Sequence, residues 1–71
     1  MADYAGTESV VGKPAHVVVA IPGGSRAGEV TVRIRGGTEA YIAYADQRID
    51  AGTEVVVVAD HGARSVSVAP L

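Results

Sequence analysis

The chain has 71 residues, a net charge of −2 and no cysteine, so it forms at most one small domain without disulfides or thiolate metal sites. Apolar residues make up 48% of the sequence, and its many β-branched valines favour strands over helices. The negative charge argues against a nucleic-acid binder, although it leaves a local basic face open. No apolar run reaches the about 18 residues of a membrane-spanning helix, and the N-terminus lacks the pattern of a signal peptide.

The polar N-terminal part predicts a flexible lead-in over residues 1–9, followed by one folded domain over residues 10–71. The first strand is expected at Ala15–Ile21, which is an uninterrupted apolar run. Such a run is either buried on both faces or bent so that the strand switches faces, as barrel strands do. Pro22 then ends the strand, because proline has no N–H to give to a central ladder.

The clearest local signal is a hairpin over residues 28–45, where apolar and polar residues alternate on both sides of Gly36 and Gly37. Glycine tolerates the positive φ angles of a two-residue hairpin turn, so these two residues are predicted to form the turn. The resulting register places Val32 opposite Tyr41 on the inward face of the ribbon.

Two more strands are expected after a connection that has no strand periodicity. Ile49 is the one large apolar residue of this connection and is expected to close one end of the core. The two strands are predicted at Thr53–Ala59 and Arg64–Ala69, and a tight turn over Asp60–Gly62 joins them.

Five short strands without a helix predict an all-β fold, because a flat sheet of this size would leave one apolar face bare. Closure into a barrel buries that face and removes the strand edges. The expected fold is a small five-stranded β-barrel, OB-fold-like or SH3-like, and the OB-fold-like form is our prediction. Its predicted core consists of Val30, Val32, Tyr41, Val55, Val57, Val66 and Val68.

A spaced set of turn glycines and inward residues runs through almost the whole chain. It consists of Gly12, Gly28, Val30, Gly36, Gly37, Tyr41, Ala43, Ile49, Gly52, Val55, Val57, Gly62, Val66, Val68 and Pro70. In this pattern residues 10–71 resemble the C-terminal soluble domain of NfeD-like proteins, which are small partners of the stomatin and flotillin membrane proteins. The resemblance implies an OB-fold domain that is held at a membrane by helices outside this chain and lies in the cytoplasm. It also implies a non-enzymatic interaction or scaffolding role, in membrane organisation or in the regulation of membrane protease activity.

Few side chains could carry out chemistry. His61 follows Asp60 as in an acid–base pair, but a solvated turn accounts for both residues better through their backbone preferences. The serines lack a nucleophile elbow, the glycine runs lack a phosphate-binding pattern, and the histidines and carboxylates are too scattered for a metal site. The sequence therefore predicts no enzyme activity, no catalytic residue, no cofactor and no metal.

The first of two candidate surfaces is basic. Arg33 and Arg35 share the outer face of the second strand, and Arg48 and Arg64 could extend this face. OB-folds bind oligonucleotides over that region, but they stack the bases on aromatic side chains, and here only Tyr44 points outward. A solvated strand face is therefore favoured over nucleic-acid binding.

The second surface is apolar, because Ile42, Tyr44, Val56 and Val58 all face outward in the predicted register. Outward residues of this type are either ordinary strand formers or, when they cluster, a partner surface. Our main hypothesis is a non-enzymatic protein-interaction module with a partner such as a stomatin- or flotillin-like membrane protein. The alternative is a free-standing OB-fold that binds single-stranded nucleic acid.

Overall fold

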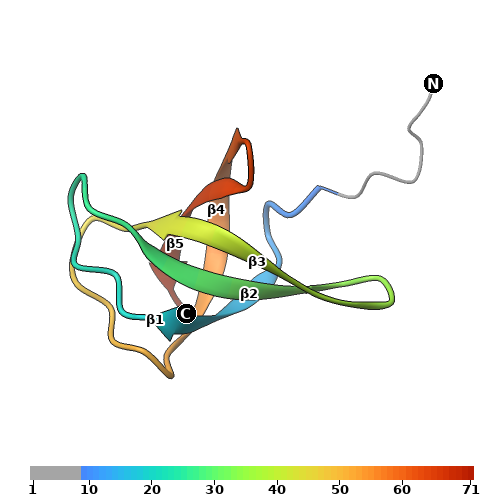
Figure 1. The fold of residues 1–71 in the computed structure, drawn as a ribbon, viewed down its shortest axis with the longest axis horizontal. Helices are drawn as coiled ribbons and strands as arrows, with labels where there is room; N and C mark the ends of the chain where they lie inside the picture. Colours follow the sequence, from blue (N-terminus) through green and yellow to red (C-terminus); the bar gives the residue numbers. More distant parts are fainter. Residues whose placement is uncertain (1–8) are drawn as a thin grey trace.

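The computed structural model of the chain describes residues 9–71, which form five strands and no helix (Figure 1). The strands are β1 (Pro14–Val19), β2 (Gly28–Ile34), β3 (Gly37–Tyr44), β4 (Glu54–Gly62) and β5 (Ser65–Pro70). Each of them overlaps a predicted strand, so the all-β prediction is confirmed. Residues 1–8 of the predicted lead-in lie outside the described residues.

The strands close into a barrel in the order β1-β2-β3-β5-β4. All neighbouring pairs are antiparallel except β3 and β5, which run parallel to each other. This order is that of an OB-fold, a five-stranded Greek-key barrel, and it confirms the OB-fold-like prediction. The β2–β3 hairpin projects beyond the barrel, as Figure 1 shows.

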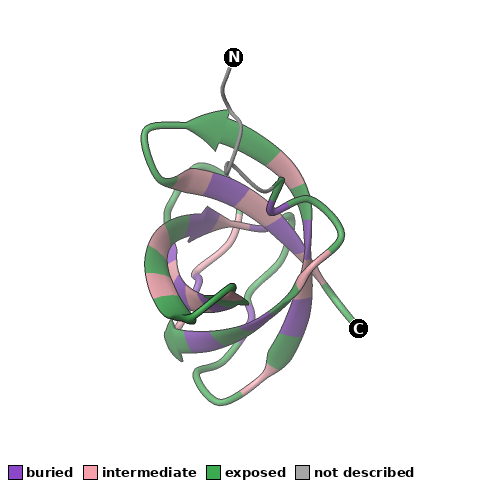
Figure 2. Ribbon diagram, turned by 90° about the vertical axis from the view of Figure 1, so that its right-hand side faces the viewer, coloured by how far each residue is buried: buried purple, intermediate pink, exposed green. Residues whose placement is uncertain are grey.

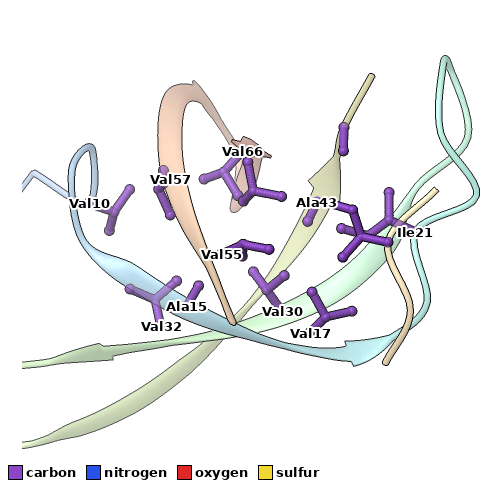
Figure 3. Packing of buried hydrophobic residues seen from close by; sticks show 13 residues of the cluster. Val10, Ala15, Val17, Ile21, Val30, Val32, Ala43, Val55, Val57 and Val66 are labelled. Carbon is purple, nitrogen blue, oxygen red and sulfur yellow. The ribbon is translucent and has the colours of Figure 1, made fainter. Parts of the chain in front are cut away.

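The inward faces of the strands form a core made largely of valine (Figure 3). The largest fully buried side chains are Val17, Ile21, Val30, Val32, Val55, Val57 and Val66. Val10 lies at one end of this cluster and Ile21 at the other. Ile49 is buried beside Ile21. Each of the two donates its backbone N–H to the carbonyl oxygen of the other, with an N–O distance of 2.9 Å. The predicted closure of the core by Ile49 is therefore confirmed.

The register of the β2–β3 hairpin differs from the predicted one by two residues. Ile34 pairs with Gly37, so Arg35 and Gly36 form the turn, and of these two only Gly36 has a positive φ, of 82°. One such residue is enough for this turn, whereas the prediction had placed both glycines in it. Because side chains alternate with a period of two, a shift of two residues leaves every side chain on its predicted face.

The turn between β4 and β5 also lies further along the chain than predicted. β4 continues to Gly62, and the turn is made by Ala63 and Arg64, whose φ angles are 53° and 57°. Bulges between Val57 and Ala59 and between Asp60 and Gly62 absorb extra residues in β4. The prediction was wrong because it assigned the turn to glycine, whereas two non-glycine residues adopt the left-handed conformation here.

β1 is not buried on both faces. Ala15 and Val17 point into the core, whereas Val18 and Val19 are exposed at 43% and 52%. The register of β1 against β2 shifts between Val17 and Val19, and such a bulge bends a strand and redirects its side chains. The chain returns to the core only at Ile21, beyond the end of the strand.

Candidate interaction surface

The four residues predicted to face outward, Ile42, Tyr44, Val56 and Val58, are called the outer apolar band below. Ile42 and Val58 are exposed at 50% and 51%, and Tyr44 and Val56 are half-buried. Figure 2 shows exposed and half-buried positions alternating with buried ones along the strands. This alternation places the band on the outside of a barrel whose interior is already filled by other side chains.

The strand order separates the two halves of the band. β5 lies between β3 and β4, so Tyr44 pairs with Ser67 on one side of β5, and Val56 pairs with Ala69 on the other. Neighbouring strands are about 4.8 Å apart, which puts the two halves roughly 10 Å apart across small β5 side chains. The sequence prediction that the band shares one face did not include this intervening strand.

A groove lies over β5 between the two halves of the band. Its first part, of about 200 Å³, is lined by Tyr44, Val58, Ser67 and Ala69, together with Gly24, Ala45, Asp46 and Val68. The second part, of about 260 Å³, is lined by Ala45, Asp46, Gln47, Arg48, Ile49, Val68, Ala69 and Pro70. The two parts share four lining residues, so they form one open groove that runs toward the end of β5.

His61 borders this surface through contacts that the sequence did not predict. Its Nε2 lies 2.7 Å from the Ser67 hydroxyl, and its ring meets the ring of Tyr44 edge-on, with the centroids 6.5 Å apart. The carboxylate of Asp60 does not orient the imidazole, because its Oδ1 accepts the backbone N–H of Gly62 at 2.9 Å. The acid–base reading of Asp60 and His61 therefore finds no support in the geometry.

Metal chemistry also lacks a site in the described part of the chain. Among residues 9–71, no group of three or more His, Cys, Asp and Glu side chains lies close enough together to hold a metal ion. The one histidine–carboxylate pair joins β1 to β4, where His16 Nδ1 lies 2.8 Å from Glu54 Oε2 on the outer face. Two ligands fall short of the three or four that a protein metal site uses.

Two of the four arginines that could form a basic face, Arg48 and Arg64, are paired with carboxylates. Arg48 pairs with Asp50, at 2.9 Å from Nε to Oδ1, and Arg64 pairs with Glu39, at 2.6 Å from Nη2 to Oε1.

Arg33 itself lines a separate depression of about 260 Å³ on β1, β2, β3 and β4, together with Pro14, Ala15, His16, Thr31, Thr38 and Glu54. This lining contains a carboxylate and no Phe, Tyr or Trp, so it offers no platform on which a base could stack. The structure therefore keeps the candidate basic face apart from Tyr44, the aromatic residue that the sequence placed outward.

Arg64 instead holds the β4–β5 turn against β3. Its guanidinium carbon lies 5.7 Å from the centroid of the Tyr41 ring, and its Nη1 donates to the carbonyl of Ala40 at 3.2 Å. The backbone carbonyl of Arg64 accepts the N–H of Ile42 at 2.9 Å. Tyr41 was predicted to be a core residue, but it is half-buried and packs against the rim of the core beneath Arg64.

The geometry thus defines a class of protein: a small closed barrel with OB-fold strand order, an apolar outer band and, within residues 9–71, no group of side chains that could hold a metal ion. Comparison with protein families places the chain more narrowly, because residues 14–69 match the NfeD C-terminal domain. The chain belongs to this family.

A solved structure supports the same assignment. The solution structure of the soluble domain of the NfeD protein YuaF from Bacillus subtilis is 34% identical to the chain, with a TM-score of 0.71. The match covers 83% of this chain and 70% of the YuaF domain. Comparison with curated proteins gave no match. Within residues 9–71, no helix has the length and apolar character needed to cross a bilayer.

Proposed function

We propose that the chain is a non-enzymatic protein-interaction module and that the outer apolar band is its contact surface. The observation that carries this proposal is the exposure of Ile42 and Val58 at 50% and 51% on one side of the barrel, next to Tyr44. Burial of apolar surface contributes about 25 cal/mol per Å², before the costs of association are counted. Tyr44 is well suited to anchor a contact, because a rigid aromatic ring with a polar tip can be buried at a low entropic cost.

The partner we propose is a membrane protein of the stomatin or flotillin type. Membership of the NfeD C-terminal domain family supports this choice, together with the resemblance on which the sequence prediction rests. In this proposal, helices outside the chain hold the domain at the cytoplasmic side of a membrane. The domain then contributes to membrane organisation or to the regulation of a membrane protease through contacts, without a catalytic step of its own.

Binding of single-stranded nucleic acid is the second candidate, and the position of Arg33 and Arg35 at the β2–β3 hairpin is what favours it. Two observations weaken this candidate. The depression beside Arg33 contains Glu54 and no Phe, Tyr or Trp, and Tyr41 lies beneath Arg64. A measured oligonucleotide affinity that falls steeply with rising salt concentration would favour nucleic-acid binding.

The test of the interaction module compares association with a membrane-embedded stomatin- or flotillin-type partner across three forms of the chain. These are the wild type, the Ile42→Ser/Tyr44→Ser variant, and a matched control, Val18→Ser/Val19→Ser, which changes exposed valines on β1. We expect the band variant to lose most of its co-sedimentation with partner membranes, while the control retains it. Thermal melting by circular dichroism shows whether each variant is folded. Equal association of the two folded variants would reject the outer apolar band as the contact surface.

A further inference from the structure

The groove over β5 is too open to enclose a cofactor or a metabolite of ordinary size. Its two parts measure about 200 and 260 Å³ and are open to solvent. Small-molecule sites commonly enclose roughly 300–1,000 Å³ and bury most of the ligand. The groove is instead suited to one or two bulky side chains of another protein, which would lie over the small residues Ser67 and Ala69 between Tyr44 and Val58.

Two carboxylates border this surface, whereas Arg48, which lines the second part of the groove, is paired with Asp50. Glu29 pairs across the ladder with Ile42, and Asp46 lines both parts of the groove. The ion pairs within residues 9–71 use His16 with Glu54, Arg48 with Asp50, and Arg64 with Glu39. None of them neutralises Glu29 or Asp46. The apolar surface is therefore bordered on two sides by carboxylates that lack an ion-pair partner in the described part of the chain.

We propose that this groove binds a short segment of the partner protein in which bulky apolar residues are flanked by lysine or arginine. The inference rests on the proposed function, since it takes the outer apolar band as the contact surface. It adds the chemistry of the occupant: the apolar side chains enter the groove beside Tyr44 and Val58, and the flanking cations lie near Asp46 and Glu29. Charge complementarity of this kind selects partners and speeds their encounter. Segments of this composition are common at the cytoplasmic ends of membrane-spanning helices.

The probe for this proposal is an acetylated, amidated hexapeptide that carries Leu-Phe between two pairs of lysines. Two matched peptides replace either the lysines by glutamates or the Leu-Phe by Ser-Ser. Each peptide is titrated into the isotope-labelled full chain at low salt, and the backbone amide resonances are followed by NMR. We expect the first peptide to shift amides at residues 44–47 and 65–69, and each matched peptide to bind at least about tenfold more weakly, because one lacks the charges and the other the apolar side chains.

Asp46→Asn and Glu54→Gln each remove one negative charge, but only Asp46 lies in the groove, whereas Glu54 pairs with His16 on another face. We expect Asp46→Asn to weaken binding of the lysine peptide by about threefold, in the range of an exposed charge pair, and Glu54→Gln to leave it unchanged. Equal effects of the two variants would overturn the proposal, as would equal binding of the lysine and glutamate peptides. Self-association of the chain through this groove, seen by sedimentation without peptide, would also overturn the proposal.

Failure of this proposal can be told apart from failure of the proposed function. If Ile42→Ser/Tyr44→Ser abolishes association with the membrane partner while Asp46→Asn leaves it unchanged, the contact surface is correct and the basic occupant is wrong. If neither variant changes that association, the contact surface itself is wrong.

Discussion

Replacing Gly28 by alanine gives the sharpest test of the packing between β1 and β2. Gly28 is buried at the start of β2, under the backbone that leaves β1. A Cβ at this position would lie 2.5 Å from the carbonyl oxygen of Ala20, and closer still to that of Val19. Ordinary van der Waals contact begins at 3.4 Å, so the backbone at the closer of these two oxygens would have to move by about 1 Å. Glycine is required here because another strand approaches its Cα closely.

The cost of this movement follows from what holds the backbone in place. Val19 pairs with Glu29, and Ile21 exchanges two backbone hydrogen bonds with Ile49 at the end of the core. Overpacking of a well-packed site costs about 1–3 kcal/mol, and each weakened backbone hydrogen bond adds about 1 kcal/mol. Alanine recovers about 0.5–1 kcal/mol by restricting the unfolded chain. We therefore expect Gly28→Ala to lower the free energy of unfolding by about 2–4 kcal/mol, out of a total of about 4–11 kcal/mol for a chain of this length.

The measurement is urea denaturation followed by circular dichroism, with Gly37→Ala as the matched control. Gly37 lies in β3 without a positive φ, and a Cβ there meets no atom within 4 Å. We expect this control to keep or slightly raise the stability, by up to about 1 kcal/mol. A loss below about 1 kcal/mol in Gly28→Ala, or the same change in both variants, would refute the close approach of β1 to Gly28.

Three further predictions concern the β4–β5 turn, its contact with β3, and the basic residues. Ala63→Gly removes a methyl group from a residue with φ of 53°, so we expect the stability in urea to rise by about 0.5–1 kcal/mol, and a loss would contradict the left-handed turn. We expect Tyr41→Ala to lower the free energy of unfolding by about 2 kcal/mol, because the ring is half-buried beneath Arg64. Truncation of a fully buried aromatic residue costs about 3–5 kcal/mol. A loss below about 1 kcal/mol or above about 3 kcal/mol would contradict this position of the ring. Titration with a single-stranded oligonucleotide at rising salt should show no steep decline in affinity, whereas a slope that Arg33→Ala reduces by about one unit would favour nucleic-acid binding.

The sequence predicted the fold well because one face of every strand must be apolar. Alternation located the β2–β3 hairpin and apolar runs located β1 and β4, and the predicted core included Val30, Val55 and Val66, which the structure buries. The two-residue error in the predicted β2–β3 register did not change this assignment, because it preserved the face on which each side chain lies. It did change the cross-strand neighbours, so that Tyr41 lies opposite Val30 instead of Val32.

The turns were harder to predict, because backbone conformation is only partly encoded by residue type. Ala63 and Arg64 both adopt the left-handed region, where glycine or asparagine would be expected. What holds them there is tertiary: Arg64 binds Glu39, stacks on Tyr41 and accepts the N–H of Ile42. These partners lie more than twenty residues away in the sequence, so no local pattern could have indicated them.

The candidate surface was predictable in its residues but not in its shape. Period-two alternation placed the outer apolar band outside, and Ile42 and Val58 are indeed exposed. The groove depends on strand order, since β5 must lie between β3 and β4 to put Ser67 and Ala69 at its floor. Strand order arises from closure of the whole barrel, which the periodicity of single strands does not specify.

If the outer apolar band is the contact surface, as proposed above, its position links binding to the closure of the barrel. β3 and β5 pair only over Ile42–Tyr44, whereas β2 and β3 pair along all of Gly28–Ile34. A partner that contacts both Tyr44 on β3 and Val58 on β4 spans β5, so it bridges the short pairing between β3 and β5. Because such a partner binds the native barrel and not the unfolded chain, it stabilises the fold by about 2.7 kcal/mol at a hundredfold excess over Kd. Against a total of about 4–11 kcal/mol, the occupied domain would resist unfolding far better than the free one, and its melting temperature would depend on partner concentration.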